Sequence, residues 1–118
     1  FVFNVETMYP RGGGSLTMGY DFDVQVKGNK VSTYLPFVGT AHHVKIGPHN
    51  TGFDFTQPIN EYELKEKRKG YRVKLDTYNG SDHIVFRFHI KSNGFATLTV
   101  ASSERQSISY SGHINLTR

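Results

Sequence analysis

The chain has 118 residues, of which 36% are hydrophobic and 20% charged, a composition typical of a single globular β or mixed domain spanning 1–118 and not of a disordered segment. It has no cysteine, so disulfides and thiolate chemistry are excluded. A net charge of +4 is too small an excess of cations to indicate nucleic-acid binding, and the sequence has no apolar run of the ~18 residues that a transmembrane helix needs.

Alternation of apolar and polar residues predicts strands along the first part of the chain. The opening strand over 1–5 has its apolar residues at every second position, and a second strand over 20–27 has the same pattern. Gly28 and Asn29 follow it and are typical of a tight hairpin turn, after which a third strand runs over 31–35. These segments therefore predict antiparallel neighbours.

The second part of the chain predicts a clearer meander. Strands are expected over 71–76, 83–91, 95–100 and 107–116, separated by short segments rich in Asn, Gly, Ser and Asp. The strand over 83–91 is the most regular of them, and its predicted core residues are Phe86 and Phe88.

The segment 59–69 fits two predictions. Pro58 at a first turn and the spacing of Glu61 and Lys65 favour a helix. Against this, Tyr62 and Leu64 alternate as in a strand and build no apolar helical stripe, so we favour the strand. The predicted fold is then all-β, an antiparallel meander of about nine short strands that forms a small barrel, complete or incomplete, or a compact sandwich.

The segment 32–55 departs from regular alternation and is the predicted mouth of the barrel. Pro36 and Pro48 have no N–H to donate, so the chain cannot pair continuously across them. A long loop on a rigid sheet is a common place for recognition. An edge strand with a bulge is the alternative. The candidate ligand-binding residues are Tyr34, Phe37 and His43.

Catalytic and metal-binding patterns are weak. The six histidines follow no metal-ligand spacing, so neither a metal site nor a cofactor is predicted. Asp21 and Asp23 lie on one face of a predicted strand, and paired carboxylates occur in hydrolases. Solvation of the outer face explains them equally well. No catalytic residue is therefore assigned, and an enzyme is not favoured.

The run 65–69 carries four cations at a predicted hairpin tip. Lysines on an edge strand discourage aggregation, and this edge protection is the favoured interpretation. Docking to phosphate or to anionic glycans is the alternative.

Five phrases occur in an order shared with a known family: FVFNVETMYP, STYLPFVGTAH, KGYRVKL, SNGFATLTV and RQSISYSGHI. In these phrases the chain resembles a domain-of-unknown-function family of small exported proteins from Bacteroides-type gut bacteria. A signal or lipoprotein leader usually precedes the domain in that family, so the resemblance implies the periplasm or cell envelope, with a lipid anchor upstream as one form of attachment. It implies no activity and no catalytic residue. The family's SYLP-aromatic phrase corresponds to 33–37, with Thr33 in place of Ser, and His43 replaces an aromatic residue.

The expected function is that of a non-catalytic envelope module that binds a small apolar ligand, a lipid or a glycan in a barrel mouth. A structural or protein-binding domain with a filled core is the first alternative. A weak hydrolase using Asp21 or Asp23 is the second. The expected partners are a lipid, a glycan or an envelope protein, and not nucleic acid.

Overall fold

The computed structural model describes residues 1–9, 16–17, 22–35, 53–104 and 107–115. Nine strands form one antiparallel sheet in the order β5-β4-β3-β1-β10-β9-β8-β7-β6, and a short β2 pairs with β1 beside that path. Within the described ranges, no helix is long and apolar enough to cross a membrane. The strands are β1 (Val2–Tyr9), β2 (Leu16–Thr17), β3 (Asp23–Lys27), β4 (Lys30–Leu35), β5 (Phe53–Pro58), β6 (Glu61–Lys67), β7 (Gly70–Asn79), β8 (Asp82–Lys91), β9 (Phe95–Ser102) and β10 (Ile108–Asn115).

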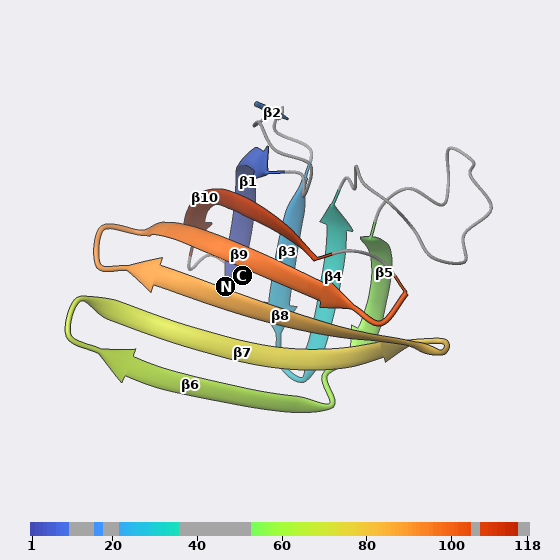
Figure 1. The fold of residues 1–118 in the computed structure, drawn as a ribbon. Coiled ribbons are helices and arrows are strands. Elements are labelled where there is room, and N and C mark those ends of the chain that lie inside the picture. The colour runs from blue at the N-terminus through green and yellow to red at the C-terminus, as the bar shows by residue number, and fades with distance from the viewer. Residues whose placement is uncertain (10–15, 18–21, 36–52, 105–106, 116–118) are drawn as a thin grey trace.

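The sheet curls into a half-barrel. Its two outermost strands, β5 and β6, are consecutive in the chain and are separated only by Ile59 and Asn60. The opposite edges of the sheet therefore meet at this corner, where Thr77 Oγ1 donates a hydrogen bond of 2.6 Å to the carbonyl of Pro58. Figure 1 shows β7, β8 and β9 crossing in front of β3, β4 and β5 at a steep angle, with β6 beyond them at the bottom of the view. The predicted all-β fold is confirmed, as an incomplete barrel.

The core lies between these two parts of the curled sheet. Every second side chain of each long strand points into it, as the alternation predicted, and Phe86 and Phe88 are both buried. We call the opposite side of the sheet the outer face. The buried apolar residues are Phe3, Val5, Met8, Val24, Val26, Val31, Leu35, Phe53, Val73, Leu75, Ile84, Phe86, Phe88, Ala96, Leu98, Val100, Ile108 and Tyr110.

Hairpin turns connect most neighbouring strands and confirm the predicted turns. Gly28 has a φ of 62° at the first position of the β3–β4 turn, a conformation that glycine adopts without a steric penalty. The segment 59–69 is a strand, because β6 pairs along its length with β7. Lys67 pairs with Gly70, so the turn of this hairpin is Arg68–Lys69.

β1 and β10, the first and last strands in chain order, pair with each other in the middle of the sheet. β1 runs antiparallel to β10 from Val2 opposite Asn115 to Tyr9 opposite Ser109, with an irregularity between Val5 and Thr7. Only a residue without a side chain fits beside this bulge, because a Cβ on Gly112 would lie 1.8 Å from the backbone oxygen of Asn4. The sequence of β10 thus fixes how closely the two strands approach.

Candidate functional site

Cations gather on the outer face of β6, β7 and β8. The register places Lys65 of β6 directly opposite Arg72 of β7, and Arg72 opposite His89 of β8. One pleat along, Lys74 of β7 lies opposite Arg87 of β8. Directly opposite side chains in an antiparallel pair have their Cβ atoms only about 4.5–5.5 Å apart. Cationic side chains of three neighbouring strands therefore share one small area.

Cations outnumber carboxylates in this arrangement, where Glu63 of β6 lies directly opposite Lys74. Like charges that lie directly opposite each other destabilise a strand pair, by up to about 1 kcal/mol. Within the described residues, the ion pair in this area joins Lys65 Nζ to Glu63 Oε2 at 3.8 Å between two exposed side chains. Arg72, Lys74 and Arg87 have no ion pair in the part of the chain that the structure describes. The repulsion is a local cost to the fold, and an anionic ligand would relieve it.

The cations line a hollow of about 380 Å³ in the outer face, within the size range of small-ligand sites. We call it the basic groove. Thr97 and Thr99 of β9 bring hydroxyl groups to one side of it. Its complete lining is Glu63, Lys65, Lys67, Arg72, Val73, Lys74, Arg87, Phe88, His89, Thr97 and Thr99.

A second hollow, of about 570 Å³, continues the basic groove toward the start of β6. It shares Glu63, Lys74 and Arg87 with the first hollow and extends past Asp76 and His83. The outer face thus has a cationic part and, beyond Lys74, a part with carboxylates. A ligand with one anionic group would be drawn to the cationic part.

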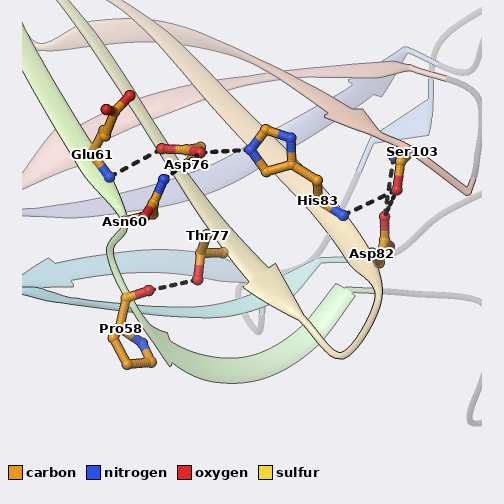
Figure 2. Close-up of polar contacts among 8 residues, drawn as sticks. All are labelled: Pro58, Asn60, Glu61, Asp76, Thr77, Asp82, His83 and Ser103. Carbon is orange, nitrogen blue, oxygen red and sulfur yellow. Dashed lines mark hydrogen bonds and ion pairs between the residues drawn. The ribbon is translucent and has the colours of Figure 1, made fainter.

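Asp76 organises the carboxylate end (Figure 2). It accepts hydrogen bonds from the backbone N–H of Glu61 at 3.0 Å and from Asn60 Nδ2 at 3.2 Å, and its Oδ2 lies 2.5 Å from His83 Nε2. Burial opposes the charged form of this carboxylate, but the hydrogen bonds from His83, Asn60 and Glu61 outweigh burial, so the pKa of Asp76 is lowered from its ordinary value. The ring of His83 also stacks on Tyr78, with centroids 4.5 Å apart.

A second carboxylate, Asp82, ties the β7–β8 turn to the end of β9 (Figure 2). Its Oδ1 accepts hydrogen bonds from Ser102 Oγ at 2.7 Å and from the backbone N–H and hydroxyl of Ser103, each at 3.1 Å. Since the Ser103 hydroxyl is bonded to Asp82, it is not paired with the His83 ring as a nucleophile would be. Among the described residues no group of three His, Asp or Glu side chains is placed to hold a metal ion. Both carboxylates therefore act as structural hydrogen-bond acceptors.

Of the candidate ligand-binding residues, the structure describes Tyr34. Its side chain is 47% exposed, and its ring lies 5.1 Å from that of Phe22. Phe37 and His43 lie outside the described residues, so the binding mouth stays a prediction. Of the carboxylates considered for a hydrolase, Asp23 accepts a hydrogen bond of 3.3 Å from Gln25 Nε2, and Asp21 is outside the described part.

The sequence had suggested cations only at the tip of the β6–β7 hairpin, and it missed the pairing of Lys74 with Arg87. A signal for this pair is present in the sequence. Once Gly80 and Ser81 are placed as a two-residue turn, counting outward along both strands puts Lys74 opposite Arg87. The alternation then assigns both side chains to the outer face.

Comparisons with known proteins identify a family and a fold. The model of the family described as "Domain of unknown function (DUF4251)" matches residues 1–114. The crystal structure of a DUF4251 family protein from Bacteroides eggerthii DSM 20697 is similar, with a TM-score of 0.73 and 14% sequence identity, over 95% of this chain and 76% of that one. No curated protein matches the chain. At this identity the structural likeness establishes the half-barrel fold and nothing about a ligand.

Proposed function

Since the chain belongs to the DUF4251 family, a domain of unknown function that supplies no activity by inheritance, we propose from its geometry that it is a non-catalytic binding module for an acidic glycan. The observation that carries the proposal is the basic groove. Its cation pair Lys74 and Arg87 lies directly opposite across two strands and has no ion pair among the described residues.

The chemistry of the groove favours a sugar acid over a free ion. Arg72 and Arg87 present planar guanidinium groups that can each donate two parallel hydrogen bonds to a carboxylate or sulfate. Thr97 and Thr99 add hydroxyls that can exchange hydrogen bonds with sugar hydroxyls. The groove is an open hollow on the outer face of the sheet, a shape that suits an extended polymer.

A polymer-binding measurement tests the proposal. We expect the protein to bind polygalacturonate, a carboxylate-bearing glycan, with an affinity that falls as salt is added, and not to bind neutral dextran. The double variant Lys74→Glu/Arg87→Glu is expected to bind polygalacturonate at least about tenfold more weakly, because it reverses both central charges of the groove.

The matched control is Lys27→Glu/Lys30→Glu. These two lysines are also exposed and directly opposite each other, on the β3–β4 hairpin, and neither lines the basic groove. The control should retain the wild-type affinity. An equal loss in both double variants would show that only net charge matters, and an absence of binding by the wild-type protein to polygalacturonate would end the proposal.

We further propose that the module works in the periplasm or cell envelope. The resemblance of its sequence to small exported proteins supports this. Fractionation of cells that produce the complete natural protein tests it, with the protein expected in the envelope or periplasmic fraction. Recovery in the cytoplasmic fraction alone would contradict it.

A further inference from the structure

The outermost strand β6 (Glu61–Lys67) is exposed along its whole length. All seven of its residues are exposed, and its only pairing in the described sheet is with β7. Its apolar side chains share this exposure: Tyr62 is 48% exposed and Leu64 is 55% exposed. Both lie on the core side of the sheet, because they are opposite the buried residues Leu75 and Val73. An edge of this kind presents unpaired backbone groups and apolar surface together.

The outer-face charges of β6 are arranged about Leu64, whereas Glu66 lies on the core side, opposite Tyr71. The strand reads EYELKEK, so Glu61 and Glu63 precede Leu64 at every second position, and Lys65 and Lys67 follow it in the same way. All four side chains lie on the outer face, opposite Asp76, Lys74, Arg72 and Gly70 of β7. When two copies of β6 lie antiparallel, the acidic half of the outer face of one copy is therefore opposite the basic half of the other.

We propose that a second copy of this chain pairs with β6 in antiparallel orientation, with a two-fold axis through Leu64. In this register Leu64 lies opposite the partner copy's same residue, Glu63 lies opposite Lys65, and Glu61 lies opposite Lys67. The two-fold axis repeats each Glu–Lys pair, so four opposite-charge pairs form. The two half-barrels then share one continuous sheet, with their core sides facing the same way.

The charges select this register over its neighbours. A shift that centres the pairing on Glu63 places two glutamates directly opposite each other, and a shift that centres it on Lys65 does the same with two lysines. Like charges directly opposite each other are unfavourable. Lysines on an edge strand thus still discourage pairing with unrelated strands, while the acidic half of β6 makes pairing with its own copy favourable.

The same pairing would also bury apolar surface of β6 that is exposed in the single copy. Leu64 would lie beside the partner copy's Leu64 on the core side. Tyr62 would lie opposite the partner copy's Glu66, whose neighbour on β7 is Tyr71, 45% exposed. The inference does not depend on the proposed glycan binding, whose central residues Lys74 and Arg87 are on β7 and β8. A negative result for glycan binding therefore does not contradict the dimer, and a negative result for the dimer does not contradict glycan binding.

Charge exchange gives the sharpest test. The variants Glu61→Lys/Glu63→Lys and Lys65→Glu/Lys67→Glu each make the outer face of β6 uniformly charged, so each alone is expected to sediment as a monomer in analytical ultracentrifugation. Mixed in equal amounts they are expected to form a heterodimer, because every outer-face pair is then Glu–Lys. The wild-type protein is expected to form a dimer. Asp54→Lys, an exposed charge reversal on β5 at the other edge of the sheet, should leave the dimer intact.

Cysteine cross-linking tests the position of the axis in a protein that has no native cysteine. Directly opposite Cα atoms in an antiparallel pair are about 4.5–5.5 Å apart, within the range that a disulfide spans. Leu64→Cys is therefore expected to form a disulfide-linked dimer under mild oxidation. In Tyr62→Cys the two sulfurs belong to residues offset by four positions, about 13 Å along the strand, so it should not.

Three results would overturn the proposal. The first is a wild-type protein that stays monomeric and whose Leu64→Cys variant forms no cross-link. The second is a dimer that persists in both uniformly charged variants or is lost in Asp54→Lys, since it would then use another surface. The third is equal cross-linking of Leu64→Cys and Tyr62→Cys, which would exclude this register.

Discussion

Phe88 lies where the two parts of the curled sheet meet. Its ring is in edge-to-face contact with Phe1, at a centroid distance of 5.3 Å, and with Phe3, at 5.7 Å. It thereby joins β8 of the front part to β1, from which the back strands continue. Its neighbour Arg87 points to the outer face and is exposed. Adjacent residues of one strand thus have opposite roles.

Replacing these neighbours separates the two roles. Phe88→Ala should lower the free energy of unfolding by about 3–5 kcal/mol, because it removes a buried ring and leaves a cavity. Arg87→Ala should change it by no more than about 0.5 kcal/mol, since the side chain is exposed. Urea denaturation of both variants measures the difference. Similar midpoints would show that the faces of β8 are assigned wrongly.

Because of Asp76, the free energy of unfolding is expected to depend on pH in the acid range. Burial acts to raise its pKa, but the hydrogen bonds from His83, Asn60 and Glu61 lower it further than burial raises it. The folded state therefore holds this proton less tightly than the unfolded chain does. The charged carboxylate stabilises the fold above the unfolded pKa of about 4, and this contribution is lost as the pH falls through the lower folded value.

Asp76→Asn is expected to cost about 1–3 kcal/mol near neutral pH, because the amide keeps only one acceptor oxygen and its NH2 group faces donors that bond the second carboxylate oxygen. The difference from wild type should shrink as the pH falls from about 4 through the lower folded pKa, below which the wild-type carboxylate is also neutral. Urea unfolding at several pH values measures it. Asp54→Asn, an exposed change, is the control and should have little effect at any pH. A cost that does not change with pH would exclude a role for the charge.

Among the elements, the β1–β10 pair depends on one glycine. Gly112 lies against the backbone of β1 beside the bulge, where a Cβ would meet the oxygen of Asn4 at 1.8 Å. Gly112→Ala should therefore destabilise the protein by about 1–3 kcal/mol or more, since the two strands must move apart. Asn115→Ala, an exposed change in the same strand, should stay within about 0.5 kcal/mol. Thermal unfolding compares the two, and equal melting temperatures would contradict the close approach.

Elements formed by local patterns could be predicted from the sequence. The alternation identified β3, β7, β8 and β9, and the turn residues placed their hairpins, because strands joined by a two-residue turn have a register fixed by that turn. The same reasoning resolved β6, where Tyr62 and Leu64 face Leu75 and Val73. In the basic groove, the pairing of Lys74 with Arg87 could be counted from the turn, whereas the hollow they line could not.

Other elements depend on contacts between distant parts of the chain. Nothing local in 1–9 indicates that β1 lies between β3 and β10, because this pairing is decided by which buried faces fit together. The cluster around Asp76 could not be predicted from the sequence either. It forms only because the corner where the sheet edges meet brings Asn60 and His83 to Asp76. The helix signals of Pro58 and Glu61 were misleading for the same reason, as pairing with β7 outweighs local preference.

At the scale of the molecule, the core, the basic groove and the free edge of β6 lie on different sides of the half-barrel sheet. The core occupies the inside of the curl, the basic groove lies on the outer face, and the free edge of β6 borders both. The proposed glycan would lie on the outer face and the proposed second copy along the edge, and the two sites share Glu63, Lys65 and Lys67 of β6. Both proposals can be tested with substitutions of exposed side chains, which leave the core unchanged.

The central pairing of β1 with β10 also sets the order of events when the chain is made. Glu6 and His113, which meet through a 2.6 Å contact between side chains of these strands, are 107 positions apart in the sequence. Contacts of such long range are slow to form. During synthesis the hairpins of β3–β4 and of β6–β9 can form early, but β1 and β9 each keep an unpaired edge until β10 has left the ribosome. The sheet can therefore be completed only after β10 has been made, and until then the nascent domain is open to mispairing at the edges of β1 and β9.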